Sequence, residues 1–129
     1  MKRLFLSFML LASIASCKKE ETPPAEKTYT IEYKLTATPK PNTSLSGNIT
    51  YVSKTSASAT ATFSSSPWTV TETTWKLKAG DKIGFTATLS NVASYQATLL
   101  VDGGVRVIKQ EGSTFMPSPT TVVVDYTVE

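Results

Sequence analysis

The chain of 129 residues contains no histidine and only one cysteine, Cys17. Histidine is the commonest general base and a frequent metal ligand, so its absence removes the usual triads and histidine-based zinc sites. A single cysteine cannot form a disulfide within the chain or build a cysteine zinc cluster. We therefore predict no catalytic residue, no cofactor and no metal site, and we predict that the protein is not an enzyme.

The sequence also lacks a strong charge of either sign. Its formal net charge is +3, from 13 basic and 10 acidic side chains. Two of the basic residues, Lys2 and Arg3, precede the cleavage site predicted below, which leaves 11 against 10 and a charge of +1. With no basic patch and no acidic block, the sequence gives no support for a nucleic-acid partner.

No apolar run is long enough to cross a bilayer comfortably. The uncharged run Leu4–Ile14 would span roughly 16 Å as a helix, about half of a ~30 Å hydrocarbon layer. Lys2 and Arg3 stand directly before it, and small residues follow it. This layout is typical of a secretory signal. We predict that residues 1–16 are a signal peptide and that cleavage falls between Ser16 and Cys17.

The residues at this cleavage site, "IASC" (Ile14 to Cys17), resemble the lipobox of bacterial lipoproteins. A thiolate is nucleophilic enough to take a diacylglyceryl group as a thioether, and small residues before it let a peptidase reach the backbone. The resemblance implies that Cys17 is lipidated, with acyl chains such as palmitate, and that two or three chains hold it firmly in a membrane. A buried structural thiol is the alternative, but Cys17 has no second cysteine to pair with.

The segment "CKKEE" (Cys17 to Glu21) resembles the export signal of surface lipoproteins of the Bacteroidota. This resemblance implies an outer-membrane lipoprotein exposed on the cell surface, and a periplasm-facing anchor is the alternative. Residues 17–27 are polar, charged and contain prolines, without apolar periodicity. We predict that they form the lipidated cysteine and a flexible tether, whose ten residues after Cys17 reach at most about 33 Å.

Residues 28–129 are predicted to form one domain, and alternation of apolar and polar residues recurs through them. The apolar positions change parity between Val70 and Trp75, which predicts a bulge or break near Glu72. The alternating segments are 29–37, 47–53, 56–64, 68–78, 82–90, 94–101 and 121–129.

Turn residues separate these segments, and no helix signal follows Cys17. Asp102-Gly103 is a favoured dipeptide for a two-residue hairpin, because glycine accepts a positive φ. Further turns are predicted at 39–42, 79–82 and 116–119. We predict an all-β fold, an antiparallel β-sandwich of seven or eight strands, with a barrel as the minor alternative.

The order of several short motifs resembles the soluble domain of the mycobacterial MmpS family. The motifs are "YTIEYKLTA", "ITYVS", "SPW", "LKAG" and "ATLLVDGGVRV", which together cover most of Tyr29 to Lys109. The resemblance implies an immunoglobulin-like sandwich anchored at its N-terminus. It also implies an accessory role beside transporters of the RND class, with a protein partner in an envelope transport complex.

Aromatic side chains are candidates for sugar stacking, but most lie on the apolar phase of their strands and are expected in the core. Trp68 follows "SSSP" at the start of its strand and is the candidate for a ligand contact. The other aromatics considered are Tyr33, Tyr51, Trp75, Tyr95 and Tyr126.

Acidic residues near strand ends are expected to cap turns, although two of them could converge as a metal or glycosidase pair. These residues are Glu72, Asp81, Asp102 and Asp125. The segment Glu111–Phe115 has a Gly-Ser pair but lacks the second glycine of a nucleophile elbow, so we expect a loop.

These features predict a lipid-anchored, non-enzymatic binding or accessory module of the envelope. Its expected partners are the membrane, through the lipid, and a protein of a transport complex. The alternative is a surface carbohydrate-binding or adhesion module. An exposed apolar patch with a polar rim would favour the first function, and exposed coplanar aromatics on one sheet face would favour the second.

Overall fold

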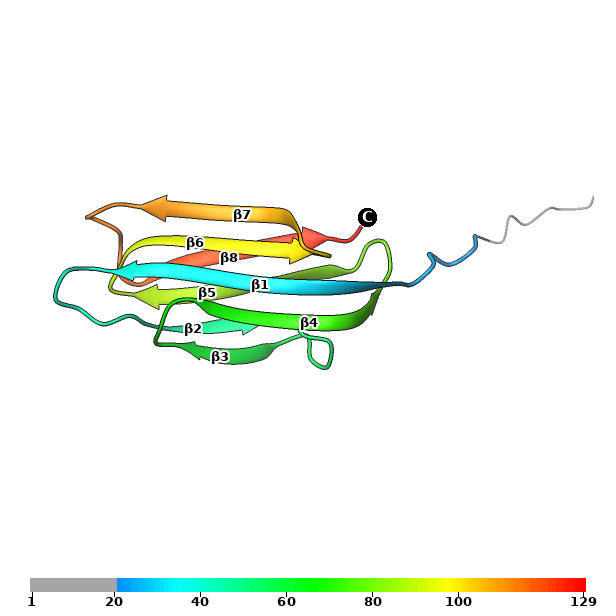
Figure 1. The fold of residues 1–129 in the computed structure, drawn as a ribbon, viewed down its shortest axis with the longest axis horizontal. Helices are drawn as coiled ribbons and strands as arrows, with labels where there is room; N and C mark the ends of the chain where they lie inside the picture. Colours follow the sequence, from blue (N-terminus) through cyan, green and yellow to red (C-terminus); the bar gives the residue numbers. More distant parts are fainter. Residues whose placement is uncertain (1–20) are drawn as a thin grey trace, which may run out of the picture.

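A computed structural model of the protein describes residues 21–129 and shows eight strands and no helix in them (Figure 1). The predicted all-β class is therefore confirmed. The strands are β1 (Lys27–Pro39), β2 (Ser46–Tyr51), β3 (Ala59–Phe63), β4 (Trp68–Leu77), β5 (Lys82–Ser90), β6 (Val92–Val101), β7 (Gly104–Gly112) and β8 (Thr120–Thr127).

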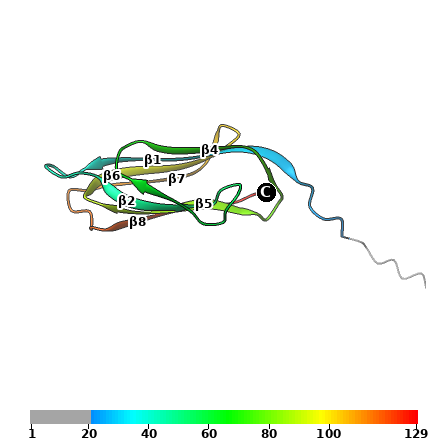
Figure 2. The ribbon, with the colours of Figure 1, turned by 90° about the horizontal axis from the view of Figure 1, so that it is seen from below.

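The strands form two layers. Sheet A has the order β4-β1-β6-β7 and sheet B the order β3-β2-β5-β8, and every pairing is antiparallel. Figure 2 shows the two layers from the side. Only the β2–β3 and β6–β7 connections stay within one sheet, and β1–β4 and β2–β5 pair strands that are distant in sequence. The predicted antiparallel β-sandwich is therefore confirmed.

The core lies between the sheets and follows the predicted alternation. In β1, Ile31, Tyr33 and Leu35 are fully buried, while Lys34 between them is exposed. Sheet B contributes buried residues of the same spacing, including Leu89 in β5. Because the inner face of each sheet is buried against the other sheet, alternate residues of every central strand are apolar.

One predicted strand is shorter than expected. The segment 56–64 was predicted to alternate throughout, but β3 begins only at Ala59, and Ala57 is exposed. Ser53 explains the difference, because its hydroxyl oxygen accepts hydrogen bonds from the backbone N–H groups of Thr55 and Ser56, at 3.4 and 3.0 Å. These bonds hold the chain in a turn and keep it out of the strand.

The predicted bulge near Glu72 is confirmed. Tyr29 pairs with Trp75 while Ile31 pairs with Glu72, so β4 contains one more residue than β1 over this stretch. Thr74 takes a φ of 54°, in the left-handed region. The extra residue returns Trp75 to the buried face, which accounts for the change of parity in the sequence.

Two tight connections set the course of the chain. The predicted Asp102-Gly103 hairpin is confirmed, with φ of 50° and 78° at its two residues. A second connection, not identified from the sequence, is the single residue Asn91, which joins β5 of sheet B to β6 of sheet A with a φ of 62°. Asparagine is among the few residues that tolerate this conformation.

Gly84 yields the first testable prediction. It pairs with Asp125 in β5 and β8, and a Cβ atom built on it would overlap the Val124 carbonyl oxygen. We expect Gly84→Ala to lower the free energy of unfolding by about 3 kcal/mol, measured by urea denaturation.

The matched control for this variant is Gly80→Ala. Gly80 also has a positive φ, 95°, but a Cβ atom there would meet nothing within 4 Å. Its expected cost is only about 1 kcal/mol, from backbone strain alone. Equal losses in the two variants would show that the close approach at Gly84 is not what limits stability.

Candidate functional site

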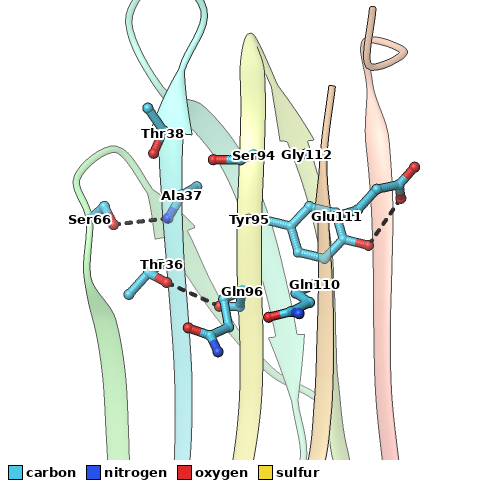
Figure 3. Close-up of a pocket in the computed structure, with 10 residues that line it drawn as sticks. All are labelled: Thr36, Ala37, Thr38, Ser66, Ser94, Tyr95, Gln96, Gln110, Glu111 and Gly112. Carbon is cyan, nitrogen blue, oxygen red and sulfur yellow. Dashed lines mark hydrogen bonds between the residues drawn. The ribbon is translucent and has the colours of Figure 1, made fainter. Parts of the chain in front are cut away.

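An open hollow of about 550 Å³ lies on sheet A where β1, β6 and β7 approach one end of the sandwich (Figure 3). We call it the distal hollow. It is lined by residues 36–38 of β1, 94–96 of β6 and 110–112 of β7, with Ser66 from the β3–β4 connection at one side. Its neutral polar side chains are Thr36, Thr38, Ser66, Ser94, Gln96 and Gln110.

The hollow forms because sheet A narrows at this end. β4 begins at Trp68, opposite Leu35, so no strand residue pairs with Ala37 on that side. The Ser66 hydroxyl takes that place and accepts a hydrogen bond from the Ala37 N–H at 3.0 Å. On the other side Ser94 pairs with Gly112, which has no side chain to fill the space opposite Ser94. The space is therefore left open beside Ala37 and Gly112, while the larger side chains of Gln96 and Gln110 line it between them.

The polar groups of the hollow fall into two sets. Thr36 donates to the Gln96 carbonyl at 3.3 Å, and the Tyr95 hydroxyl donates to the Glu111 carboxylate at 3.5 Å. Burial raises the pKa of Tyr95, and the negative charge of Glu111 raises it further. Gln96 of β6 and Gln110 of β7 are paired residues, so their side chains lie on the same face of the sheet, and neither amide has a hydrogen bond within residues 21–129. Their donors and acceptors can bind a partner.

The distal hollow lies away from the segment that leads to Cys17. Residues 21–26 leave the sandwich at the start of β1, on the right of Figure 1, while β1 ends on the left. Thr36 lies nine residues beyond Lys27 along an extended strand, a distance of about 30 Å. The hollow is therefore presented at the end opposite the predicted tether.

An apolar patch continues the same outer face of sheet A towards the tether. Val105 is 58% exposed and Ile108 51% exposed, and Val105 pairs with the half-buried Leu100. A second hollow of about 280 Å³ adjoins the patch and shares Thr36 and Gln96 with the distal hollow. The outer face thus runs from apolar to polar without interruption.

Trp68, the predicted ligand contact, lies half-buried in an aromatic cluster. Its ring centroid is 5.6 Å from that of Tyr51 and 5.6 Å from that of Phe85, in edge-on and tilted geometries. Such pairs stabilise a core beyond their buried area. A sugar ring can stack only on an exposed aromatic side chain. Tyr33 and Trp75 are buried, and Tyr51, Tyr95 and Tyr126 are half-buried. A ligand role for Trp68 stays a prediction.

The loop expected over Glu111–Phe115 is shorter in the structure, because Glu111 and Gly112 end β7 and only the residues from Ser113 to Phe115 lie in the connection to β8. No role is expected from the sequence for Phe115. In the structure it is 91% exposed, more than any other large apolar side chain of the described part of the chain. The only signal in the sequence is its place outside any alternating segment. A loop residue of this kind is not distinguishable from a packed one until the loop conformation is known.

Two of the predicted turn acids accept backbone hydrogen bonds, Asp81 within its own turn and Asp102 from the edge of β1. An Asp102 carboxylate oxygen accepts a hydrogen bond from the Thr30 N–H at 2.7 Å, and one of Asp81 accepts from the Lys78 N–H at 3.0 Å. The expectation of a turn cap is confirmed for Asp81, whereas the Asp102 carboxylate joins the β6–β7 hairpin to β1. Between Glu21 and Glu129 no three acidic side chains gather as a metal would require.

The predicted signal peptide, the cleavage site at Ser16 and Cys17, and the lipidation of Cys17 lie outside the described residues. The described part contains no helix that is long and apolar enough to cross a membrane. In comparisons with known proteins, no family model and no curated protein matches the chain.

Tyr33 provides a testable pH dependence. Its hydroxyl donates to the Val52 carbonyl at 2.8 Å, the side chain is fully buried, and burial raises its pKa above the ordinary value of 10.0. The unfolded chain therefore ionises first, so the stabilisation is complete below pH 10 and is lost as the pH rises from there towards the folded pKa.

We expect the free energy of unfolding to fall by up to about 1.4 kcal/mol per pH unit above pH 10 through this residue. Urea titrations between pH 8 and pH 11 measure the fall. Tyr33→Phe should be less stable at pH 8, because the Val52 carbonyl loses its partner, but its stability should decline less steeply. An unchanged slope in the variant would contradict the assignment.

Proposed function

We propose that the protein is a lipid-anchored, non-catalytic binding module of the bacterial envelope, attached through Cys17 and binding a protein partner on the outer face of sheet A. The observation that carries the proposal is the continuous outer face, where the apolar patch of Leu100, Val105 and Ile108 borders the polar distal hollow. An apolar patch with a polar rim is typical of protein interaction sites.

The anchoring part of the proposal is supported by the order of the segments. The lipobox-like residues end at Cys17, and the exposed residues 21–26, which have no secondary structure, lead directly into β1. A lipid at Cys17 would hold the sandwich by the end of its longest strand. The binding face then runs along the side and towards the far end of the domain.

The resemblance to the MmpS family supports a partner in a transport assembly. That family accompanies transporters, and the two-sheet sandwich found here is compatible with the fold that the resemblance implies. If the lipid places this chain on the cell surface, the partner is an outer-membrane or surface protein, because an inner-membrane pump lies out of reach. Fold likeness alone does not transfer a function, so the partner must be identified by binding.

A carbohydrate-binding function is the second candidate. The neighbouring amides of Gln96 and Gln110, with hydroxyl groups nearby, favour it, since such neutral donors and acceptors suit a polyol. Against it, no exposed aromatic residue lines the distal hollow to stack on a sugar ring. The apolar patch gives the protein partner the better support.

The anchor is tested by Cys17→Ala. We expect the variant to lose incorporation of labelled palmitate and to leave the envelope fraction, because only the thiol accepts the lipid. Ser16→Ala, which keeps a small residue before the cysteine, should behave like the parent chain. A Cys17→Ala protein that still sediments with envelopes would refute lipid anchoring.

Intact cells that carry the parent chain can show which side of the membrane the anchored domain faces. Trypsin added to intact cells should cleave at the exposed Lys27 and release the sandwich. Protection in intact cells, with cleavage after lysis, would mean that the domain faces the periplasm.

The binding face is tested by placing the photo-crosslinking residue p-benzoylphenylalanine in the anchored chain. We expect a discrete protein adduct when it replaces Ile108, on the outer face of sheet A. Val123 is the matched control, since it is 45% exposed but belongs to β8 of sheet B. Equal adducts from both positions, or none from position 108, would contradict a partner on this face.

A further inference from the structure

Phe115 is the most exposed large apolar side chain between Glu21 and Glu129, at 91%, whereas Val105, Ile108 and Val123 range from 45% to 58%. Single exposed apolar residues are common on protein surfaces and need no function. Phe115 differs because its loop, residues 113–119 between β7 and β8, is hydrogen-bonded to the sandwich both before and after Phe115 in the chain.

The loop is fixed before Phe115 by Ser113. The Ser113 N–H donates to the Ala93 carbonyl at 2.9 Å, which attaches the loop to β6. The Ser113 hydroxyl accepts a hydrogen bond from the Phe115 N–H at 3.1 Å, and its carbonyl accepts one from the Met116 N–H at 3.3 Å. These bonds close a tight turn with the phenyl ring at its outside.

The loop is fixed after Phe115 by its neighbour. Met116 is buried, with 3% of its surface exposed, and packs in the core. Its carbonyl accepts a hydrogen bond from the Lys40 side-chain amine at 2.7 Å, and the Pro117 carbonyl accepts one from the Thr120 hydroxyl at 2.6 Å. Because Met116 occupies the core position, Phe115 is held in solvent. A rigid aromatic side chain loses little entropy on binding and is typical of interface anchors.

The ring lies at the end of the sandwich opposite the predicted lipid. Lys40 directly follows β1, so its bond to Met116 places the loop at the far end of that strand from Lys27 (Figure 1). The thirteen residues of β1 span about 40 Å. With the domain upright on its tether, the loop that carries Phe115 lies at the end farther from the bilayer that holds Cys17.

A second copy of the chain is a poor occupant for this position. A copy standing beside the first presents the distal hollow at that height, and the mostly polar lining of this hollow does not suit a phenyl ring. The hollow lined by Tyr51, Ile83 and Gly84 has about 200 Å³, but it lies towards the tether end. A copy stacked there, end to end above the first, would raise its own Lys27 by about 40 Å, beyond the ~33 Å that ten tether residues can reach.

We propose that Phe115 is the anchor of a docking surface formed by residues 113–119 and the adjoining distal hollow, and that its ring enters an apolar pocket of a different protein. Gly112 lines the hollow and directly precedes the loop, so the two parts are continuous. Gln96 and Gln110 supply hydrogen-bonding groups for the polar rim of that pocket. This inference rests on the proposed function for the orientation of the domain.

The test replaces Phe115 with p-benzoylphenylalanine, which keeps an aromatic ring, in the full anchored chain carrying a C-terminal tag. Irradiation of intact cells should give one discrete adduct with another protein. Coexpressed untagged parent chain should lower its yield at least fivefold, and untagged Phe115→Ser should change it less than twofold. Position 115 is exposed, so Phe115→Ser should keep the melting temperature of the parent.

Each other result overturns the docking surface. Absence of an adduct, an adduct of the mass of two copies, or equal competition by Phe115→Ser would each refute it. A membrane contact is detected separately with the full chain carrying Cys17→Ala and vesicles of phosphatidylethanolamine and phosphatidylglycerol. If that chain sediments with vesicles only when Phe115 is present, the ring binds lipid and the protein-docking proposal is wrong.

The two proposals fail in different ways. An adduct from position 108 without one from position 115 leaves the outer face of sheet A as the binding site and removes the role of Phe115. Envelope sedimentation of Cys17→Ala refutes the lipid anchor, whatever adducts form. An adduct from position 115 alone moves the partner from the outer face to the end of the sandwich.

Discussion

The hydrogen bonding of β1 on both edges is the constraint on which the rest of the structure depends. β4 pairs with one edge and β6 with the other, so β1 is central to sheet A. Its inward residues supply the fully buried Ile31, Tyr33 and Leu35, and its outward Thr36 belongs to both hollows of the outer face. The residue after its end, Lys40, reaches the loop of Phe115. Core, binding face and loop are thus positioned by one strand.

Much of this fold could be predicted because strand periodicity is local. The parity change in β4 indicated the bulge, and Asp102-Gly103 indicated its own hairpin, since each signal lies within a few residues. The late start of β3, at Ala59, could not be predicted in this way. It depends on the hydroxyl of Ser53, and a serine in a polar segment has the same appearance whether it caps a turn or faces solvent.

The candidate site was less predictable because it is built from residues that are distant in sequence. The pairing of Gln96 with Gln110 requires the register of β6 with β7, and the hollow beside them requires Ser66 to reach Ala37 from another connection. No spacing in the chain contains that information. The sequence also does not show which of the two neighbours Phe115 and Met116 enters the core, because both are large and apolar. In the structure Met116 is buried, and the Lys40 side chain binds its carbonyl.

The course of β1 also determines how the domain would bear a load. A pull between the start of β1 and the loop beside its far end acts along the strand, parallel to its neighbours. The hydrogen bonds on both edges of β1 would then be loaded together in shear, and they cannot be opened one after another. Such a geometry resists stretching better than one in which a terminal strand peels away. A tethered domain of this design would transmit tension between its two ends while its sheets stay intact.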